Sequence, residues 1–596
     1  MSKPNTQPQT AAYFNLTVLA VFFHAFMEWL FFVTQSSSLS TLSWLEKLKV
    51  LFVTGGALSV PVLILLLIFI VPARIWKILG YLPAALMLTI SALLLLDNFT
   101  YTVAKFGVVS TTGAWRILYI IGLVVIFYGA LGFIRRQKLW KGASVLTFSL
   151  LAVSAGAILS IYLSRDSALD GYAPTTFTKR SNIIIIGGDG LSAKYLSAYG
   201  YEENTTPFLA ELMESSLAAE NAFPNASSTT ASTTSILTGQ EPAEVKVYRY
   251  PDILSDDDSL KHLPGILKNA GYKTVEIGAP SYVDARKVNI ANGFDIINGQ
   301  SYENPILDAL QPMLGNSPSA YFIQIVVERI SQRLAHIFFI SDMVNPFEAV
   351  NNPKARLTDA GRKDQIISLL EGSDKPLFIF AHFMNTHGPH FGSDDNNSTV
   401  ESPNAEEEWD VELYKEAIRN FDGHVQEIYN FLEESGELEN TILVIYTDHG
   451  YRYVVNARIP IIIRFPNAEH AGRVTNNSQI IDIPVTILDY LGADRPDWMT
   501  GASLIDGELP ATREIIGITA GSPKKIKPPF YQIKSVQVLV CQKWYVLNVQ
   551  DLEWKTGEVV GHTAPCDPAL LPPEEQIRQK IVDYLDHYGY DISGLK

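Results

Sequence analysis

The chain has 596 residues, a formal net charge of −16 and an apolar content of 47%, so it is long enough for more than one domain. The acidic balance excludes nucleic acid from the expected partners, because the chain has no basic stripe that could replace the counterions around a phosphate backbone. The apolar residues are concentrated in the first 165 positions. We therefore expect a membrane-integral region followed by a globular one.

Five apolar stretches lie in this first region, and each is close to the ~20 residues that an α-helix needs to cross a hydrocarbon core of ~30 Å. They occupy residues 11–33, 50–73, 78–98, 115–134 and 143–163. A signal peptide followed by buried core helices is the alternative, but five long spans so close together disfavour it. The sequence predicts a transmembrane domain of five helices over residues 1–165.

Basic residues in the short loops predict the orientation of these helices. They follow the second and fourth spans, at Arg74, Lys77, Arg135, Arg136, Lys138 and Lys141. The N-terminus is then cytoplasmic, and everything after about residue 165 is periplasmic or extracellular. The first external loop weakens this bias without reversing it, through Glu46, Lys47 and Lys49. A multi-pass protein of a bacterial inner (plasma) membrane fits this pattern and the low cysteine content.

After a polar linker at 166–180, short apolar runs alternate with amphipathic stretches. Runs such as NIIIIGGDG, PLFIFAHF and TILVIYTDHG are typical of buried strands in a parallel sheet that helices cover on both faces. The predicted fold is α/β, with a mostly parallel central sheet in a domain at 181–510. A C-terminal subdomain at 511–596 is predicted to hold a small antiparallel sheet and a helix.

Two further features of this exported part leave alternatives open. The stretch 319–340 has an apolar face at a spacing of four, which we expect to pack inside the protein rather than on the membrane surface; it comprises Phe322, Val326, Ile330, Leu334 and Phe338. The only two cysteines, Cys541 and Cys566, fit either a disulfide in an oxidising compartment or two separate thiols.

Acidic and imidazole side chains stand at the ends of two predicted strands: Asp189 in GGDG, and Asp448 with His449 in YTDHG. Ligands bind beyond the carboxyl ends of the strands in such sheets, and these side chains suit a divalent metal that leaves a position open for substrate. A nucleophile could come from NASSTTASTTSILTG at 225–239, whose helix-like end would offer free backbone N–H groups to an anion. A solvated Ser/Thr loop is the alternative for that stretch.

The exported part resembles the alkaline phosphatase superfamily, in its sulfatase-like branch. The segment NIIIIGGDGLSAKYLSAYGYEENTTPFLAEL is similar to the opening of that family. Its later landmarks are matched in order by LPGILKNAGYKTVEIG, FIFAHFMNTHGPH, TILVIYTDHG and IDIPVTILDYLGADRPDWMTGASL. The resemblance runs from about residue 180 to 510 and implies a sulfatase-like catalytic domain at 181–510.

The resemblance also implies roles for individual side chains. It makes Asp189, Asp448 and His449 metal ligands, and it makes His387, in NTHGPH, a residue that contacts the anionic group of the substrate. The implied cofactor is a divalent metal, Zn or Mn, with Ca or Mg as alternatives.

The nucleophile implied by the resemblance lies ten residues before the Gly of the LTG landmark. Counting back from Gly239 gives Thr229, which would also belong to the metal shell. Because the motif is degenerate, Ser228 and Thr230 stay open as alternatives. Thr229 speaks against an ordinary sulfatase, since formylglycine chemistry requires Cys or Ser at that position.

A threonine nucleophile resembles instead the membrane phosphotransferases of the superfamily, such as lipoteichoic acid synthases and phosphoethanolamine transferases. The implied function is transfer of phosphoethanolamine or phosphoglycerol from a phospholipid donor to an extracytoplasmic glycan or lipid acceptor, through a phospho-threonine intermediate. A sulfatase or phosphodiesterase of an exported polymer is one alternative. A catalytically reduced membrane sensor is another, because the short YRYVVNAR loop after His449 offers no further His or Lys. That loop also favours one metal over two.

Overall fold

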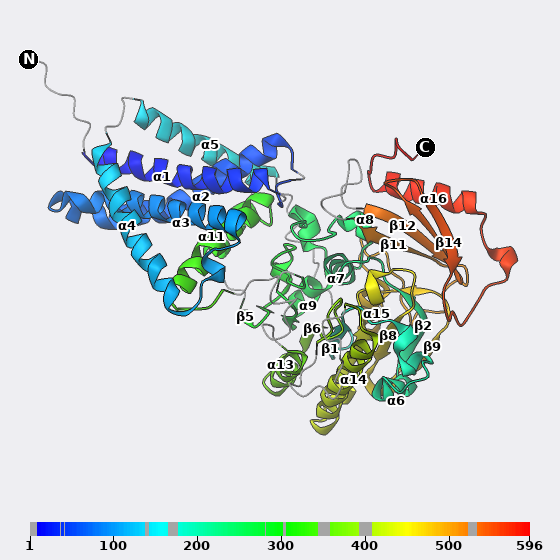
Figure 1. The fold of residues 1–596 in the computed structure, drawn as a ribbon. Helices are drawn as coiled ribbons and strands as arrows, with labels where there is room; N and C mark the ends of the chain where they lie inside the picture. The colour runs from blue at the N-terminus through cyan, green and yellow to red at the C-terminus, as the bar shows by residue number, and fades with distance from the viewer. Residues whose placement is uncertain are drawn as a thin grey trace, which may run out of the picture. The chain divides into compact units, whose positions relative to one another are not determined.

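The computed structural model describes residues 9–35, 37–40, 42–137, 142–164, 177–280, 282–301, 305–343, 358–392, 408–521 and 533–595. These residues form two compact units (Figure 1). The first unit comprises Met1–Ala168 and Glu303–Asn345, and the second comprises Leu169–Tyr302 and Pro346–Lys596. The described residues do not include Lys138 and Lys141, on which the predicted orientation partly rests. They also do not include residues 166–176 of the predicted linker.

Five long apolar helices begin the first unit. They are α1 (Gln9–Thr34), α2 (Trp44–Ile70), α3 (Leu82–Ala104), α4 (Arg116–Arg136) and α5 (Ala143–Ser164). Each is long and apolar enough to cross a membrane, so the prediction of five apolar N-terminal helices is confirmed. Local sequence fixes where α2 begins, because Ser43 and Glu46 form a capping box there.

Two later helices of the first unit are α10 (Pro305–Leu314) and α11 (Pro318–Ile337). The sequence boundaries place them in the catalytic domain, whereas in the structure α11 packs against α2 and α4. Its predicted apolar face is fully buried at Phe322 and Val326 and half-exposed at Phe338. Apolar packing is supplemented by three ion pairs: Arg329 with Glu28 (2.8 Å), Arg333 with Asp97 (2.6 Å) and Arg116 with Asp342 (2.6 Å).

A mixed, mostly parallel sheet is the centre of the second unit. Among the described residues it has ten strands, in the order β10-β2-β8-β7-β1-β6-β3-β4-β5 with β9 paired to β2. The bounds are β1 (Asn182–Gly188), β2 (Leu217–Phe223), β3 (Lys273–Ile277), β4 (Ile296–Ile297), β5 (Gln300–Ser301), β6 (Leu377–Phe383), β7 (Thr441–Tyr446), β8 (Ile459–Arg464), β9 (Gly472–Val474) and β10 (Ser478–Gln479). The central strands β3, β6, β1 and β7 run parallel, and all but the first residue of β3 are buried.

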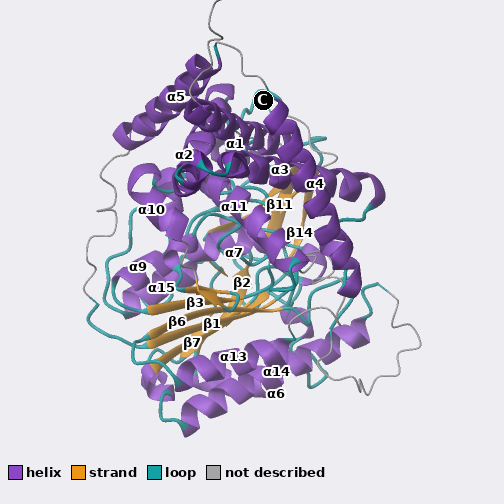
Figure 2. Cartoon of the chain, turned by 90° about the vertical axis from the view of Figure 1, so that its left-hand side faces the viewer, coloured by secondary structure: helices purple, strands orange, loops and turns teal. Residues whose placement is uncertain are grey.

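Helices cover both faces of this sheet (Figure 2). One face packs against α6 (Pro207–Leu212), α13 (Asp359–Glu371) and α14 (Val411–Glu434). The other packs against α7 (Thr229–Thr238), α9 (Leu263–Asn269) and α15 (Asp482–Tyr490). The short α8 (Pro242–Val245) follows α7. Coverage on both faces explains why these strands are continuous apolar runs in the sequence.

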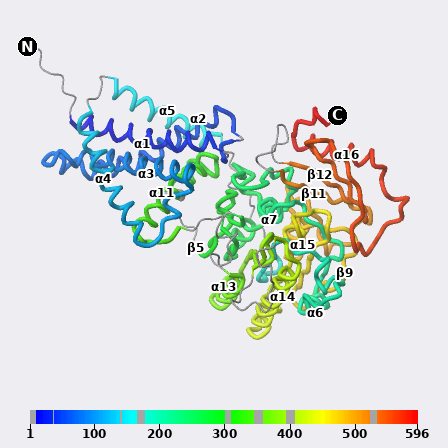
Figure 3. Tube along the Cα trace, viewed as in Figure 1, coloured from blue at the N-terminus to red at the C-terminus, as the bar shows by residue number. Residues whose placement is uncertain are grey.

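A separate antiparallel sheet of four strands forms the C-terminal part, with α16 beside it (Figure 3). Its elements are β11 (Glu514–Ala520), β12 (Ile533–Val540), β13 (Lys543–Asn548), β14 (Trp554–Glu558) and α16 (Glu574–His587). This confirms the predicted small sheet and helix. Cys541 and Cys566 form a disulfide, which decides between the two alternatives that the sequence left open.

Candidate active site

The carboxyl ends of three parallel strands bring the candidate site together. β1 pairs with both β6 and β7, so Gly187 lies beside His382 on one side and Tyr446 on the other. Asp189 follows two residues after Gly187, and Asp448 two residues after Tyr446. Residues far apart in the sequence therefore meet at one edge of the sheet, as expected for a parallel α/β fold.

Four side chains surround one point at this edge. Asp189, His382 and Asp448 each offer a ligand atom, and these atoms lie within 4.8 Å of one another. Nε2 of His449 lies 3.7 Å from Oδ1 of Asp189 and 3.3 Å from Oδ2 of Asp448. The structure thus brings together the three ligands that the resemblance implies and adds a fourth candidate, His382.

The unsatisfied atoms in this cluster fit a bound cation. Oδ1 of Asp189, Oδ2 of Asp448 and Nε2 of His449 are buried and have no hydrogen-bond partner among the described residues. Leaving carboxylate oxygens in this state is costly, and a divalent metal would satisfy them. Two carboxylates with two imidazoles suit Zn or Mn better than Ca or Mg, which prefer oxygen ligands. Among the described residues, the His, Cys, Asp and Glu side chains that lie close enough to one another to hold a metal are those of Asp189, His382 and Asp448.

The charges of the site reinforce one another. Burial raises the pKa of Asp189, but the opposing effects of His387, His382 and His449 outweigh it, and the pKa lies well below its usual range. Burial lowers the pKa of His382, but its hydrogen bond to Asp189 and the charge of Asp448 outweigh this, and the pKa is raised. Nε2 of His382 lies 3.2 Å from Oδ2 of Asp189. Asp189 therefore stays ionised in a buried place, as a ligand of a cation must.

Backbone groups hold the ligands in place. The N–H of Gly190 donates to Oδ1 of Asp448 at 3.1 Å. Nδ1 of His449 lies 3.2 Å from the carbonyl oxygen of Gly450; a proton on Nδ1 would make that bond and leave Nε2 free to bind a metal. Gly190 adopts a φ of +66°, and a Cβ there would lie 3.5 Å from the His449 ring. Glycine thus lets the turn after Asp189 bring its backbone N–H to Asp448.

Thr229 is the first residue of α7 and is 6% exposed. Its hydroxyl donates to Oδ2 of Asp189 at 3.2 Å. The hydroxyl of Ser228 donates instead to the carbonyl of Tyr248, and that of Thr230 donates to the carbonyl of Tyr282. Of the three adjacent hydroxyls, the one on Thr229 faces the candidate metal ligands, at a helix N-terminus whose free N–H groups favour an anion.

His387 follows β6 and is 8% exposed. Its ring centroid lies 6.2 Å from those of Tyr282 and Tyr453. Tyr453 also contacts the His449 ring, with centroids 4.8 Å apart, and its hydroxyl donates to the carbonyl of Gly388. The structure therefore places His387 beside the ligand cluster, where its charge acts on Asp189. Contact with a substrate anion stays a prediction.

Sequence reasoning did not single out three residues near this site: His382, Tyr453 and Asp359. His382 lies inside an apolar strand, and a lone imidazole in such a run was the available signal. Asp359 holds the loop after β6, because its carboxylate accepts from the backbone N–H groups of Met384 and Asn385 at 2.7–3.0 Å. Nothing in the local sequence marks Tyr453 or Asp359, since Asp359 binds backbone groups 25 residues later and the Tyr453 hydroxyl donates to the distant Gly388 carbonyl.

Comparison with known proteins identifies the class. A family model described as sulfatase matches residues 181–493, more than half of the chain. The chain therefore belongs to the sulfatase family, within the alkaline phosphatase superfamily. Members of this superfamily are metal-dependent enzymes, in keeping with the cluster around Asp189.

Individual relatives are distant. An N-acetylglucosamine-6-O-sulfatase of Bacteroides thetaiotaomicron is 34% identical over 104 residues, covering 15% of this chain and 19% of the relative. An extracellular sulfatase SULF-1 homolog of Drosophila melanogaster is 23% identical over 293 residues, covering 42% and 24%. A solved 2-O GAG sulfatase is 16% identical with a TM-score of 0.49, covering 70% of this chain and 94% of that one. The chain spans a quarter or less of the length of these two curated relatives.

Proposed function

We propose that this protein is a membrane-anchored, metal-dependent phosphotransferase that uses Thr229 as its nucleophile. The observation that carries the proposal is the Thr229 hydroxyl, which donates to Asp189 within the cluster of metal-binding side chains. An ordinary sulfatase forms its nucleophile from Cys or Ser, and neither stands at this position. Threonine suits direct attack on phosphorus instead.

The transfer would take place in two displacements. In the first, Oγ of Thr229 forms a bond to phosphorus, the bond from phosphorus to the diacylglycerol oxygen breaks, and the threonine proton ends on the released diacylglycerol. In the second, an acceptor hydroxyl attacks the phospho-threonine, Oγ leaves and regains a proton, and the acceptor carries the head group. The N–H groups at the start of α7 would bind the phosphoryl oxygens, and His387 would add positive charge beside them.

A divalent metal held by Asp189, His382, Asp448 and His449 would lower the pKa of the nucleophilic hydroxyl and neutralise phosphate charge. The chain's own contribution is to orient the nucleophile. The hydrogen bond from Thr229 to Asp189 fixes the direction of its hydroxyl, and the burial of the site excludes bulk water that would otherwise compete with the acceptor.

Two features outside the site support action on a phospholipid at the outer face of a membrane. The five apolar N-terminal helices are long enough to span a bilayer, where the donor would be available. The disulfide between Cys541 and Cys566 is the kind of bond that persists in oxidising, extracytoplasmic compartments. The proposed donor is phosphatidylethanolamine or phosphatidylglycerol, and the acceptor is an extracytoplasmic glycan or lipid.

The test is intact-protein and peptide mass spectrometry of the full-length protein, loaded with Zn or Mn and incubated with both phospholipids. We expect a phosphoethanolamine or phosphoglycerol adduct on the peptide that contains Thr229. Thr229→Ala should abolish the adduct and the transfer of labelled head group, whereas the matched controls Ser228→Ala and Thr230→Ala should keep both. Transfer that survives in Thr229→Ala would refute the assignment.

Hydrolysis of a sulfate or phosphate ester is the second candidate, favoured by the sulfatase names of the relatives. It predicts release of free sulfate or phosphate without an acceptor. A sensor without catalysis predicts neither product, and it predicts that Asp448→Asn leaves the cellular role intact. The same incubation, assayed for free anions and for labelled acceptor, separates the three functions.

A further inference from the structure

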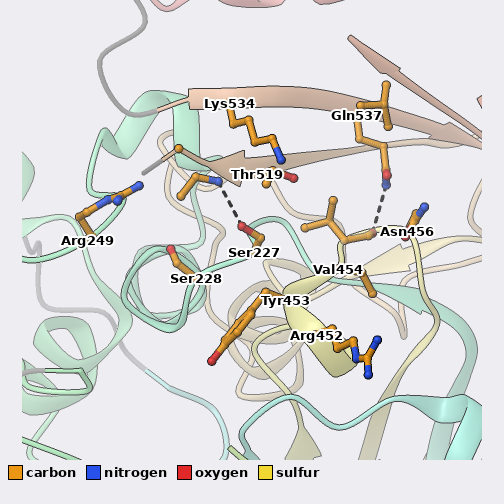
Figure 4. A pocket seen from close by; sticks show the side chains of 14 residues that line it. Ser227, Ser228, Arg249, Arg452, Tyr453, Val454, Asn456, Thr519, Lys534 and Gln537 are labelled. Atoms are coloured by element: carbon orange, nitrogen blue, oxygen red, sulfur yellow. Dashed lines mark hydrogen bonds between the residues drawn. The ribbon is translucent and has the colours of Figure 1, made fainter. Parts of the chain in front are cut away.

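A cleft of about 640 Å³ lies beside the candidate site, between α7 and the C-terminal sheet (Figure 4). Ser227 and Ser228, which precede Thr229, line one side, and Lys534 and Gln537 of β12 line another. The hydroxyl of Ser227 accepts from the N–H of Ala520, which ties the two walls together. All fourteen lining residues belong to the described part of the second unit.

The charge of this cleft is opposite to that of the chain. The chain has 62 acidic against 46 basic residues, yet the cleft is lined by three cationic side chains, Arg249, Arg452 and Lys534, and by no carboxylate. In an acidic protein, a cleft whose charged lining is entirely cationic attracts anions.

Two of the three cations are available to a ligand. Within the described residues, Nε of Arg249 is buried without a hydrogen-bond partner, and Lys534 is exposed. The nearby Asp252 carboxylate accepts from the backbone N–H of Arg249. Figure 4 shows Arg249 and Lys534 on different elements, at different sides of the set of lining residues. Arg452 lies instead over the ring of Trp409.

Two residues connect the lining of the cleft to the reacting centre. Tyr453 lines it and contacts the ring of His449, and Ser228 precedes Thr229 directly. A molecule bound in this cleft would therefore lie beside Arg249 and Lys534 and next to the segment that carries Thr229.

We propose that Arg249 and Lys534 bind a second anionic group, a phosphate or sulfate ester, on the acceptor. This inference rests on the proposed transfer function. The donor phospholipid has a single phosphodiester, which the reacting centre takes up, and its leaving diacylglycerol is neutral. The second anion therefore belongs to the acceptor, whose class is an anionic glycan or glycolipid. Guanidinium and ammonium groups are the side chains that recognise such esters.

The experiment measures binding without turnover, in full-length protein in nanodiscs that carries Thr229→Ala and bound metal. The probes are glucose, glucose 6-phosphate and glucose 1,6-bisphosphate, titrated calorimetrically. We expect the bisphosphate to bind about tenfold more tightly than the monophosphate, the gain from one further charged hydrogen bond. Arg249→Gln or Lys534→Gln should remove most of this advantage, and Arg249→Lys should keep more of it than Arg249→Gln.

Lys543→Gln is the matched control, because Lys543 lies in the same small sheet and does not line the cleft. It should leave the bisphosphate advantage unchanged, and all variants should keep the melting temperature of the parent. The proposal is overturned if the parent shows no preference for the bisphosphate, or if that preference survives in both glutamine variants. The parent in this experiment is the Thr229→Ala protein, which cannot transfer a head group. The binding result can therefore be interpreted even if the transferase proposal fails.

Discussion

The hydroxyl of Thr229 donates to Oδ2 of Asp189 across 3.2 Å, and the same oxygen lies 3.2 Å from Nε2 of His382. One carboxylate thus joins the proposed nucleophile, at the start of α7, to an imidazole inside β6. The hydroxyl and the imidazole are both positioned by Asp189, so the nucleophile and a candidate metal ligand depend on the same residue.

Replacing His382 should weaken metal binding. His382→Gln removes one imidazole ligand from the cluster, and we expect affinity for Zn or Mn to fall by about 10- to 100-fold. The measurement is metal content by mass spectrometry after dialysis against graded chelator concentrations. The control is His424→Gln, which removes another buried imidazole, from α14, outside the cluster. Equal metal retention in both variants would exclude His382 from the metal site.

That Asp189, Asp448 and His449 lie close together could be predicted from the sequence because of a property of parallel sheets. Each follows an apolar run that ends in a loop, and the carboxyl ends of neighbouring parallel strands lie at one edge. His382 could not be found in this way, because it precedes the end of β6. Its place depends on pairing: it lies beside Gly187, whose missing side chain leaves room for the imidazole.

The place of residues 303–345 in the first unit also depends on contacts between residues distant in the sequence. Linear order placed them in the catalytic domain, since they lie between two of its strands. The available signal was in the spans themselves: Glu28 and Asp97 stand in apolar helices, and acids there require partners. Those partners, Arg329 and Arg333, come from α11.

Asp359 should hold the loop that carries His387. Asp359 is 1% exposed. Its carboxylate accepts from the N–H groups of Met384 and Asn385 and forms an ion pair with Arg362 at 2.7 Å. Asp359→Asn leaves Arg362 buried without its anion, so we expect a loss of about 3 kcal/mol in the free energy of unfolding. Chemical denaturation measures it. Asp364→Asn, an exposed acid of the same helix, should change the stability by less than about 0.5 kcal/mol.

If Asp359→Asn and Asp364→Asn denature at the same concentration, the carboxylate does not hold this loop. A correctly folded Asp359→Asn variant should also bind phosphate less well than the parent, because the displaced loop moves His387.

Glu276 should make the second unit less stable at alkaline pH. Burial, and next the Asp284 carboxylate, raise the pKa of Glu276 to about 8. A raised pKa means that the native state favours the protonated acid. The contribution of protonated Glu276 to the free energy of unfolding is fully present below the unfolded pKa of 4.5, and it is lost as pH rises through about 8.

Glu276→Gln keeps a neutral side chain that still accepts from the N–H of Ala285. Its melting temperature should exceed that of the parent by about 5 °C at pH 8.5 and match it at pH 4.5. Differential scanning fluorimetry across this range gives the comparison. Glu371→Gln, at the exposed end of α13, should show no such trend. A constant difference between Glu276→Gln and the parent at all pH values would contradict the assignment.

The ion pair between Arg329 and Glu28 should hold α11 on the membrane helices. Arg329 donates to Glu28 at 2.8 Å and to Asn98 at 2.9 Å, and the Glu28 side chain is 4% exposed. Glu28→Gln leaves the guanidinium without its anion in a buried place, which costs about 3–5 kcal/mol in comparable pairs. We expect α11 to detach in part, so that a protease cleaves within 305–343 at least tenfold faster in detergent.

The charge-exchanged double variant, Glu28→Arg with Arg329→Glu, restores an opposite pair at the same place and should recover part of the protection. Glu46→Gln, at the exposed start of α2, is the control that removes an acid without touching α11. Purely apolar packing of Phe322 and Val326 predicts a different result, namely that all these variants resist the protease equally. Because the acids lie on α1 and α3 and the arginines on α11, a loss of protection confined to the charge variants would show that electrostatic pairing fixes where this helix binds.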